Sequence, residues 1–313
     1  MKTIFYFSLF ASLSFFLSCT TIPTDIAPGA RDVQLGHDNR IRNVNFHIPK
    51  RLKRKNRSLV LVLHAGEGSA KNIAAITKRE FNKISDQDNF IVGYPEALNE
   101  YWNDGRTDSI SLSHYEDIDD VGFLEKTIDF AIDSFKVDPQ FVFVAGYSNG
   151  GLMALRLACE LPGRIKGYAA VAASLSLDQL VDCTIDTSSS LMLINGTEDP
   201  IMPYDGGQVI SRGQPQGSVL SSEETINFWL KENNCTPKTT SRDVPNTDTF
   251  DETRSEKTTF SGCKQGNKAV LITINNGGHT WPGGRQYLSE KEIGKTSRDF
   301  DASEEIWRFF KNL

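Results

Sequence analysis

Short apolar runs alternate along the chain with longer segments in which apolar residues recur at helical spacing. Runs of this length without charged positions are typical of strands buried on both faces of a parallel sheet, and they occupy 59–63, 90–95, 141–145, 167–173, 190–194 and 269–274. Residues 40–48 instead alternate polar and apolar positions, which predicts a strand with one buried face. Helices are predicted over 70–87, 121–135, 152–161, 218–232 and 300–312. Strands that alternate with helices indicate an α/β fold, with a mostly parallel central sheet and helices on both faces.

The start of the chain has the layout of a bacterial export signal. Residues 1–19 combine a short charged start, an apolar run over 4–17 and the small pair Ser18-Cys19. The apolar run is shorter than the about 20 residues that a membrane-spanning helix needs. Ser18-Cys19 also resembles a lipoprotein processing site, so we expect Cys19 to carry a lipid that holds the protein on a membrane; ordinary secretion without the lipid is the alternative. Residues 20–38 are then predicted to be a tether, and 39–313 a single α/β domain.

The charge balance narrows the class of partner. The chain carries 34 Lys and Arg against 40 Asp and Glu, a net charge of −6, so there is no electrostatic case for nucleic acid as a partner. The run Lys50–Arg57 holds six basic residues in eight positions. We interpret it as a solvated turn between two strands; an anionic membrane surface beside a lipid anchor is the alternative.

Export changes how the cysteines are interpreted. Apart from Cys19, four remain, and an even number in an oxidising compartment predicts two disulfides. None of them has the C-x-x-C spacing of zinc or thiol redox sites. Neighbour pairing is the choice made here among three possible connectivities, which gives Cys159–Cys183 and Cys235–Cys263.

One hydroxyl lies between a predicted strand and a predicted helix. The stretch 146–151, GYSNGG, follows the apolar run 141–145 and precedes the helical segment 152–161. A G-x-S-x-G turn in that position strains the serine backbone and exposes its hydroxyl at the carboxyl edge of the sheet. Ser148 is therefore the candidate nucleophile, provided that a base is available to take its proton.

A histidine and an acid follow the serine in the order that such a site requires. His279 comes just after the run 269–274, in a glycine-rich loop, which favours it as the base over the other four histidines. The acid that orients its ring is expected after the strand 190–194. Asp199 is our choice there, and its neighbours Glu198 and Asp205 remain alternatives.

Ester hydrolysis also needs hydrogen-bond donors for the oxyanion of the tetrahedral intermediate. One is expected from the backbone N–H of Asn149, the residue after the serine, and the other from the loop after an earlier strand. The loop 64–68, HAGEG, has that place. We expect its donor to be the Gly66 N–H.

Four separated segments carry a family resemblance. LVLVLHAGEGSA, GYSNGGLMALRLACELP, INGTEDPIMPY and GGHTWPGG, in that order from about residue 40 to the C-terminus, resemble the secreted polyhydroxybutyrate depolymerase and feruloyl esterase family of α/β-hydrolases. The resemblance implies an α/β-hydrolase fold and a cofactor-free serine esterase. It also implies Ser148 as nucleophile, His279 as base and Asp199 as acid, with Gly66 and Asn149 as oxyanion donors. The family loop usually contains His-Gly where this chain has His64-Ala65.

The substrate is less well specified than the chemistry. Trp102 and Trp281 lie in loops on either side of the predicted site, where they would form an aromatic wall for a phenolic acid or an apolar chain; packing beneath the loops is the alternative. We expect a small or oligomeric ester as substrate. A serine peptidase of the same fold and a non-catalytic surface protein on a hydrolase scaffold are the other candidate functions.

Overall fold

The computed structural model describes residues 26–52, 55–181, 183–185 and 189–313. The predicted export signal, the predicted lipidation site Cys19 and the first part of the predicted tether lie outside these residues. None of the helices in the described ranges is both long enough and apolar enough to cross a membrane.

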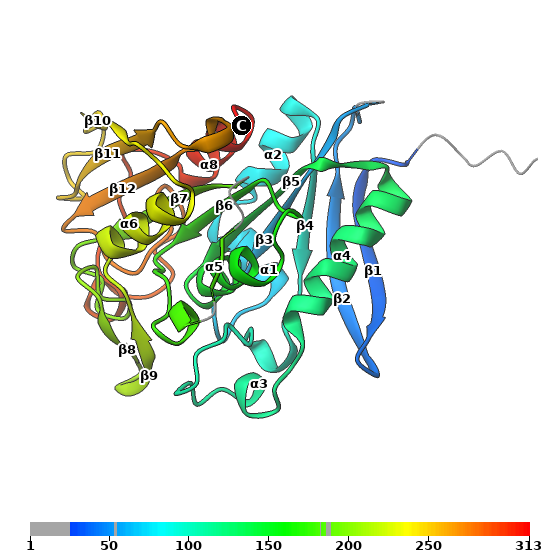
Figure 1. Cartoon of the computed structure of the whole chain (residues 1–313), viewed down its shortest axis with the longest axis horizontal. Coiled ribbons are helices and arrows are strands. Elements are labelled where there is room, and N and C mark those ends of the chain that lie inside the picture. Colours follow the sequence, from blue (N-terminus) through cyan, green and yellow to red (C-terminus); the bar gives the residue numbers. More distant parts are fainter. Residues whose placement is uncertain (1–25, 53–54, 182, 186–188) are drawn as a thin grey trace, which may run out of the picture.

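A twisted sheet forms the centre of the molecule (Figure 1). Within the described ranges it contains ten strands, in the order β1 (Gly29–His37), β2 (Arg40–Ile48), β4 (Ile91–Pro95), β3 (Arg57–Leu63), β5 (Val137–Tyr147), β6 (Gly167–Val171), β7 (Ser190–Gly196), β12 (Ala269–Asn275), β11 (Arg254–Ser261) and β10 (Lys238–Asp243). The six central strands, from β4 to β12, run parallel, while two strands at each edge pair antiparallel. These six are the six apolar runs, so the predicted mostly parallel sheet is confirmed.

Helices cover both faces of the sheet. The alternation of side chains along β3 shows the division: Leu59, Leu61 and Leu63 pack with the helices of one face, and Val60 and Val62 with those of the other. The first face carries α4 (Asp120–Phe135), α5 (Asn149–Glu160) and α6 (Ser222–Glu232). The second carries α1 (Ala70–Ile76), α2 (Glu80–Asp88) and α8 (Ala302–Phe310). Shorter elements lie in the connections: η1 (Leu98–Glu100), α3 (Leu112–Tyr115), η2 (Asp178–Val181), η3 (Lys264–Gly266), α7 (Glu290–Ile293) and the hairpin of β8 (Gly207–Ser211) and β9 (Gln214–Val219).

Two expectations about the first hundred residues are wrong. The predicted tether does not extend to residue 38, because Gly29–His37 forms the edge strand β1. Most of its side chains are solvent-exposed, so it has no apolar run; pairing with β2 along its whole length holds it in place. The single helix expected over 70–87 is two helices, because Lys78 and Arg79 adopt positive φ angles between α1 and α2.

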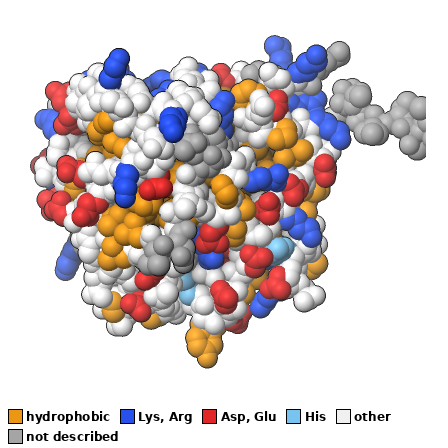
Figure 2. Space-filling view, viewed as in Figure 1, with side chains coloured by type: hydrophobic (Ala, Val, Ile, Leu, Met, Phe, Trp, Pro, Cys, Tyr) orange, Lys and Arg blue, Asp and Glu red, His pale blue; other side chains and the backbone are white. Residues whose placement is uncertain are grey.

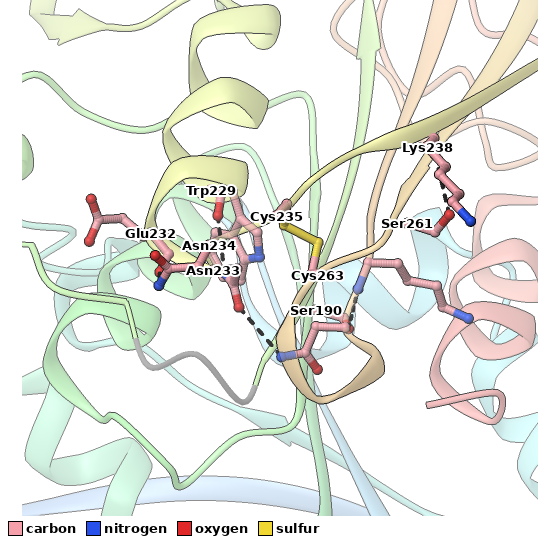
Figure 3. The surroundings of a disulfide bond; sticks show 11 residues. Ser190, Trp229, Glu232, Asn233, Asn234, Cys235, Lys238, Ser261 and Cys263 are labelled. Atoms are coloured by element: carbon pink, nitrogen blue, oxygen red, sulfur yellow. Dashed lines mark hydrogen bonds between the residues drawn. A yellow bond between two sulfur atoms is a disulfide. The ribbon is translucent and has the colours of Figure 1, made fainter.

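Both predicted disulfides are confirmed. Cys159–Cys183 ties the end of α5 to the loop before β7. Cys235–Cys263 joins the chain just after α6 to the turn that precedes β12 (Figure 3). Each bond closes a short loop, and a loop of such length contributes about 3 kcal/mol in the chain-entropy model.

The surface carries both signs of charge. On the face drawn in Figure 2, acidic and basic side chains are interspersed, with apolar patches between them. The described basic residues between β2 and β3, which are Lys50, Arg51 and Lys55, are exposed, and residues 53–54 of the run lie outside the described ranges. Arg57 differs from the rest of the run, because it is buried at the start of β3 and donates to the Phe135 carbonyl oxygen at 2.7 Å.

Candidate active site

Ser148 occupies a strained turn between β5 and α5. Its φ of 54° and ψ of −120° lie in a region that side-chain-bearing residues rarely adopt. Two glycines make the turn possible, because helix and strand approach closely. A Cβ on Gly146 would lie 2.0 Å from the Gly150 carbonyl oxygen, and a Cβ on Gly150 would lie 2.4 Å from the His64 carbonyl oxygen. The strand, strained turn and helix that the G-x-S-x-G pattern predicts are therefore present.

The serine hydroxyl lies against His279. The distance from Ser148 Oγ to His279 Nε2 is 2.8 Å, and the distance from His279 Nδ1 to Asp199 Oδ2 is also 2.8 Å. The imidazole and the carboxylate are almost fully buried. The fold thus brings together three side chains that are far apart in the sequence, each at the carboxyl end of a parallel strand: β5, β7 or β12.

The carboxylate oxygen of Asp199 that does not face His279 holds the side chain in place. Oδ1 accepts hydrogen bonds from the backbone N–H groups of Ile201 and Met202, each at 2.8 Å, which leaves Oδ2 for His279. The alternatives Glu198 and Asp205 are exposed. Among the three acidic residues considered, the geometry thus selects Asp199 as the partner of the ring.

The backbone of His279 is fixed as well. Its N–H donates to the Ile293 carbonyl oxygen at 2.6 Å, and its carbonyl oxygen accepts from the Tyr147 hydroxyl at 2.6 Å. The Tyr147 hydroxyl also contacts the hydroxyl of Tyr287 at 3.0 Å. Burial raises the pKa of Tyr147 well above its ordinary value, so this hydroxyl stays protonated and remains a donor.

The loop after β3 is organised by His64. The ring donates from Nδ1 to the Ala65 carbonyl oxygen at 2.7 Å, and Nε2 accepts from the Ala97 N–H at 3.0 Å. Only the neutral ring can make both bonds, since Nε2 must carry a free lone pair. Burial lowers the pKa of His64 to about 4, which keeps it neutral. This histidine braces the loop that contains Gly66.

A cavity of about 620 Å³ opens at the serine. Ser148, His279, Asn149 and Gly66 all line it. Its remaining walls are mainly apolar, and they come from α1, α5, the 200–202 segment, the β8–β9 hairpin and the 287–293 segment, with Ile73, Leu152, Ile201, Met202, Val209, Ile210, Tyr287 and Leu288 among the lining residues. Charged side chains also line it, namely Glu67, Arg106, Arg212 and Glu292. The site therefore suits the apolar part of an ester.

The expected aromatic wall is wrong. Trp102 and Trp281 are both 0% exposed, and neither lines the cavity. The Trp102 indole donates to the His64 carbonyl oxygen at 2.9 Å, and the Trp281 indole donates to Ser303 Oγ at 3.2 Å. Both rings pack beneath the loops. Two tyrosines, Tyr101 and Tyr287, do line the cavity, and neither was predicted. The signals available were the position of Tyr101 next to Trp102 and that of Tyr287 in the loop after His279.

Sequence reasoning also missed a buried ionic cluster beside Asn149. Asp104 is fully buried and accepts hydrogen bonds from Arg106, from His114 and from the Asn149 side chain. Burial alone would raise the pKa of Asp104, but the Arg106 guanidinium and His114 hold it below its ordinary value. The Asp104 side chain is therefore a carboxylate. Within the described ranges, no group of three or more His, Cys, Asp or Glu side chains is arranged to hold a metal ion.

Comparison with known proteins identifies relatives of this chain. Residues 52–212 match the family model described as phospholipase/carboxylesterase. NocK of Nocardia uniformis subsp. tsuyamanensis, which carries the name of an esterase, is 28% identical over 254 residues, or 79% of this chain and 72% of its own length. Feruloyl esterase B of Piromyces equi is 29% identical over 195 residues, or 61% of this chain but only 33% of its own length.

A solved structure supports the architecture. The acetyl xylan esterase of Aspergillus awamori superposes with a TM-score of 0.59, covering 91% of this chain and 100% of that one at 12% identity. Identity this low shows the fold alone. Together with the family match, it confirms the predicted α/β-hydrolase fold.

Proposed function

The chain belongs to the phospholipase/carboxylesterase family of α/β-hydrolases, which makes it a carboxylic ester hydrolase, and we propose that it acts as a serine esterase through an acyl-enzyme on Ser148. The observation that supports this mechanism most directly is the pair of 2.8 Å contacts that join Ser148, His279 and Asp199 at the cavity. A nucleophile, a base and an orienting acid in hydrogen-bond contact form a catalytic triad.

The chemistry follows from these contacts. Ser148 Oγ attacks the acyl carbon while its proton passes to His279 Nε2, and Asp199 stabilises the imidazolium through Nδ1–H. The backbone N–H groups of Gly66 and Asn149 receive the oxyanion of the tetrahedral intermediate. His279 then protonates the leaving alcohol. A water molecule that gives its proton to the same nitrogen attacks the acyl-serine, which releases the acid and restores the serine.

Substitution of the nucleophile tests this proposal. Ser148→Ala is expected to lower kcat for p-nitrophenyl acetate by about 10⁴-fold or more and to abolish covalent labelling by a fluorophosphonate, with an unchanged unfolding transition. A folded Ser148→Ala protein that retains near wild-type turnover would refute the assignment. A wild-type protein that neither labels nor hydrolyses esters would favour a non-catalytic binding role instead.

We propose an ester of the feruloyl type as the substrate, within the polyhydroxybutyrate depolymerase and feruloyl esterase group. The name of the Piromyces relative and the largely apolar walls of the cavity support this choice. Methyl ferulate, acetylated xylan, short hydroxybutyrate oligomers and p-nitrophenyl esters should be assayed side by side. A methyl ferulate kcat/KM below those of both other natural-type substrates would count against it.

We also propose that the protein is exported. Two disulfides support this location, since such bonds persist in oxidising compartments. Anchoring through a lipid on Cys19 remains a prediction from the sequence. Labelling of the wild-type protein with radioactive palmitate, but not of Cys19→Ser, would agree with it, and an unlabelled wild-type protein would rule the anchor out.

A further inference from the structure

Trp102 lies between the two segments that supply the proposed oxyanion donors. On one side, its indole N–H donates to the carbonyl oxygen of His64, at the start of the loop that contains Gly66. On the other side, its backbone N–H donates to Asn149 Oδ1 at 2.8 Å, and its carbonyl oxygen accepts from Asn149 Nδ2 at 3.0 Å. One buried residue thus contacts both segments of the proposed oxyanion hole.

These contacts and one more occupy every hydrogen-bonding group of the Asn149 side chain. Besides Trp102, its Nδ2 donates to Asp104 Oδ2 at 2.6 Å, so both amide hydrogens and the amide oxygen have partners. Asn149 is the first residue of α5 and follows the nucleophile directly. Because its side chain is tied down, the peptide that carries the proposed donor is held at one place relative to Trp102.

The residue before Trp102 strengthens this connection. The Tyr101 ring packs against Gly66 so closely that a Cβ on the glycine would lie 2.4 Å from Tyr101 Cε1. Burial and the nearby charge of Glu67, the residue after Gly66, raise the pKa of the Tyr101 hydroxyl. The Tyr101 ring at Gly66 and the Trp102 indole at His64 thus give the 101–104 segment two contacts with the loop that contains Gly66.

The far end of the segment is anchored to the protein interior. Arg106 makes two hydrogen bonds to the Asp104 carboxylate, at 2.9 and 2.7 Å, and His114 Nε2 lies 2.9 Å from it. All three side chains are buried. A charge-assisted cluster of this kind is rigid, and it holds the segment in place from below.

We infer that Trp102 is a positioning residue for the oxyanion hole: it sets the separation of the Gly66 and Asn149 N–H groups by bonding to the segments that carry both. The inference rests on the proposed function. Preorganised donors stabilise the oxyanion only where their spacing matches the transition state, and a misplacement of 1 Å costs up to about 10²-fold in rate. Loss of the indole bond should then weaken transition-state binding more than ground-state binding.

Trp102→Phe is the direct test, because it keeps an aromatic ring and removes the indole donor. We expect kcat for p-nitrophenyl acetate to fall by about tenfold or more, with KM within about twofold. Affinity for an alkyl trifluoromethyl ketone, whose adduct with Ser148 carries an oxyanion, should fall by a similar factor. The pH profile of kcat/KM should keep its apparent pKa, because the His279–Asp199 pair is untouched.

Trp307→Phe is the matched control. This indole is also buried and also donates, at 2.6 Å to Asp88 Oδ2, but Trp307 does not line the cavity. It is expected to lower stability without changing kcat or affinity for the ketone. If Trp102→Phe does not fold, Asn149→Ala provides a second route, since it removes the side-chain bonds to Trp102 and Asp104, adds no charge beside the proposed oxyanion, and keeps the backbone N–H; the same loss in kcat and ketone affinity is expected.

Two results would overturn the inference. One is a folded Trp102→Phe enzyme with kcat and ketone affinity within about twofold of wild type. The other is a loss that appears equally in Trp307→Phe, which would show a general effect of losing a buried indole. A different result would show that the proposed function itself is wrong. In that case Ser148→Ala would keep its activity, whether or not Trp102→Phe lost any.

Discussion

The stability of this protein should depend on pH through His64. In the folded chain Nε2 accepts from the Ala97 N–H, and burial lowers the pKa of the ring to about 4, against an ordinary value of 6.5. Between these two values the unfolded chain binds a proton at this residue and the folded chain does not. Protonation therefore favours the unfolded state as the pH falls from 6.5 toward 4.

The size of the effect follows from the gap between the two pKa values. Each pKa unit corresponds to about 1.4 kcal/mol, so His64 is expected to remove about 3 kcal/mol from the free energy of unfolding over this range. Above pH 6.5 the ring is neutral in both states, so it does not make the free energy of unfolding depend on pH. Below pH 4 it is charged in both, and the loss is complete.

Urea unfolding of wild type and His64→Gln at several pH values between 4 and 8 measures this contribution. Glutamine offers an oxygen near the position of Nε2 but does not titrate. All other titratable groups are the same in both proteins, so the difference in their pH dependence reports on His64. As the pH falls below 6.5, wild type should lose about 3 kcal/mol more than the variant. A difference between the two proteins that stays constant with pH would refute the reasoning.

Three further changes test other parts of the structure. Gly150→Ala places a Cβ 2.4 Å from the His64 carbonyl oxygen, a backbone atom, so kcat/KM should fall by about 10²-fold in a p-nitrophenyl acetate assay; near wild-type activity would mean that α5 is free to shift. Asp199→Asn should lower kcat by about 10⁴-fold, because the amide no longer holds the required tautomer, and a loss under tenfold in the same assay would point to another acid. Replacing Cys235 and Cys263 together by Ala should lower the free energy of unfolding by about 3 kcal/mol in urea, whereas unchanged stability would contradict the loop-entropy argument.

Local sequence determined the central sheet and the turn that carries the candidate nucleophile Ser148. A strand segment that is buried on both faces must be apolar, so the buried parts of β3 to β7 and β12 are visible as short apolar runs without knowledge of their partners. The turn around Ser148 is equally local, since close contact between strand and helix requires glycine at 146 and 150. The order of serine, acid and histidine, each after a predicted strand, then indicated the site.

Only the tertiary structure decided which neighbours complete that site. Strand β1 has few buried positions, so its assignment depends on pairing with β2 rather than on its own pattern. Asp199 and Glu198 are adjacent in sequence, and the backbone after β7 turns one toward His279 and leaves the other exposed. The direction in which a loop tryptophan points is likewise set by distant partners, and this is why Trp102 lies under the loop that begins at His64 instead of facing the cavity. Burial along a strand is encoded residue by residue, whereas the orientation of a loop side chain depends on contacts with segments far away in the sequence.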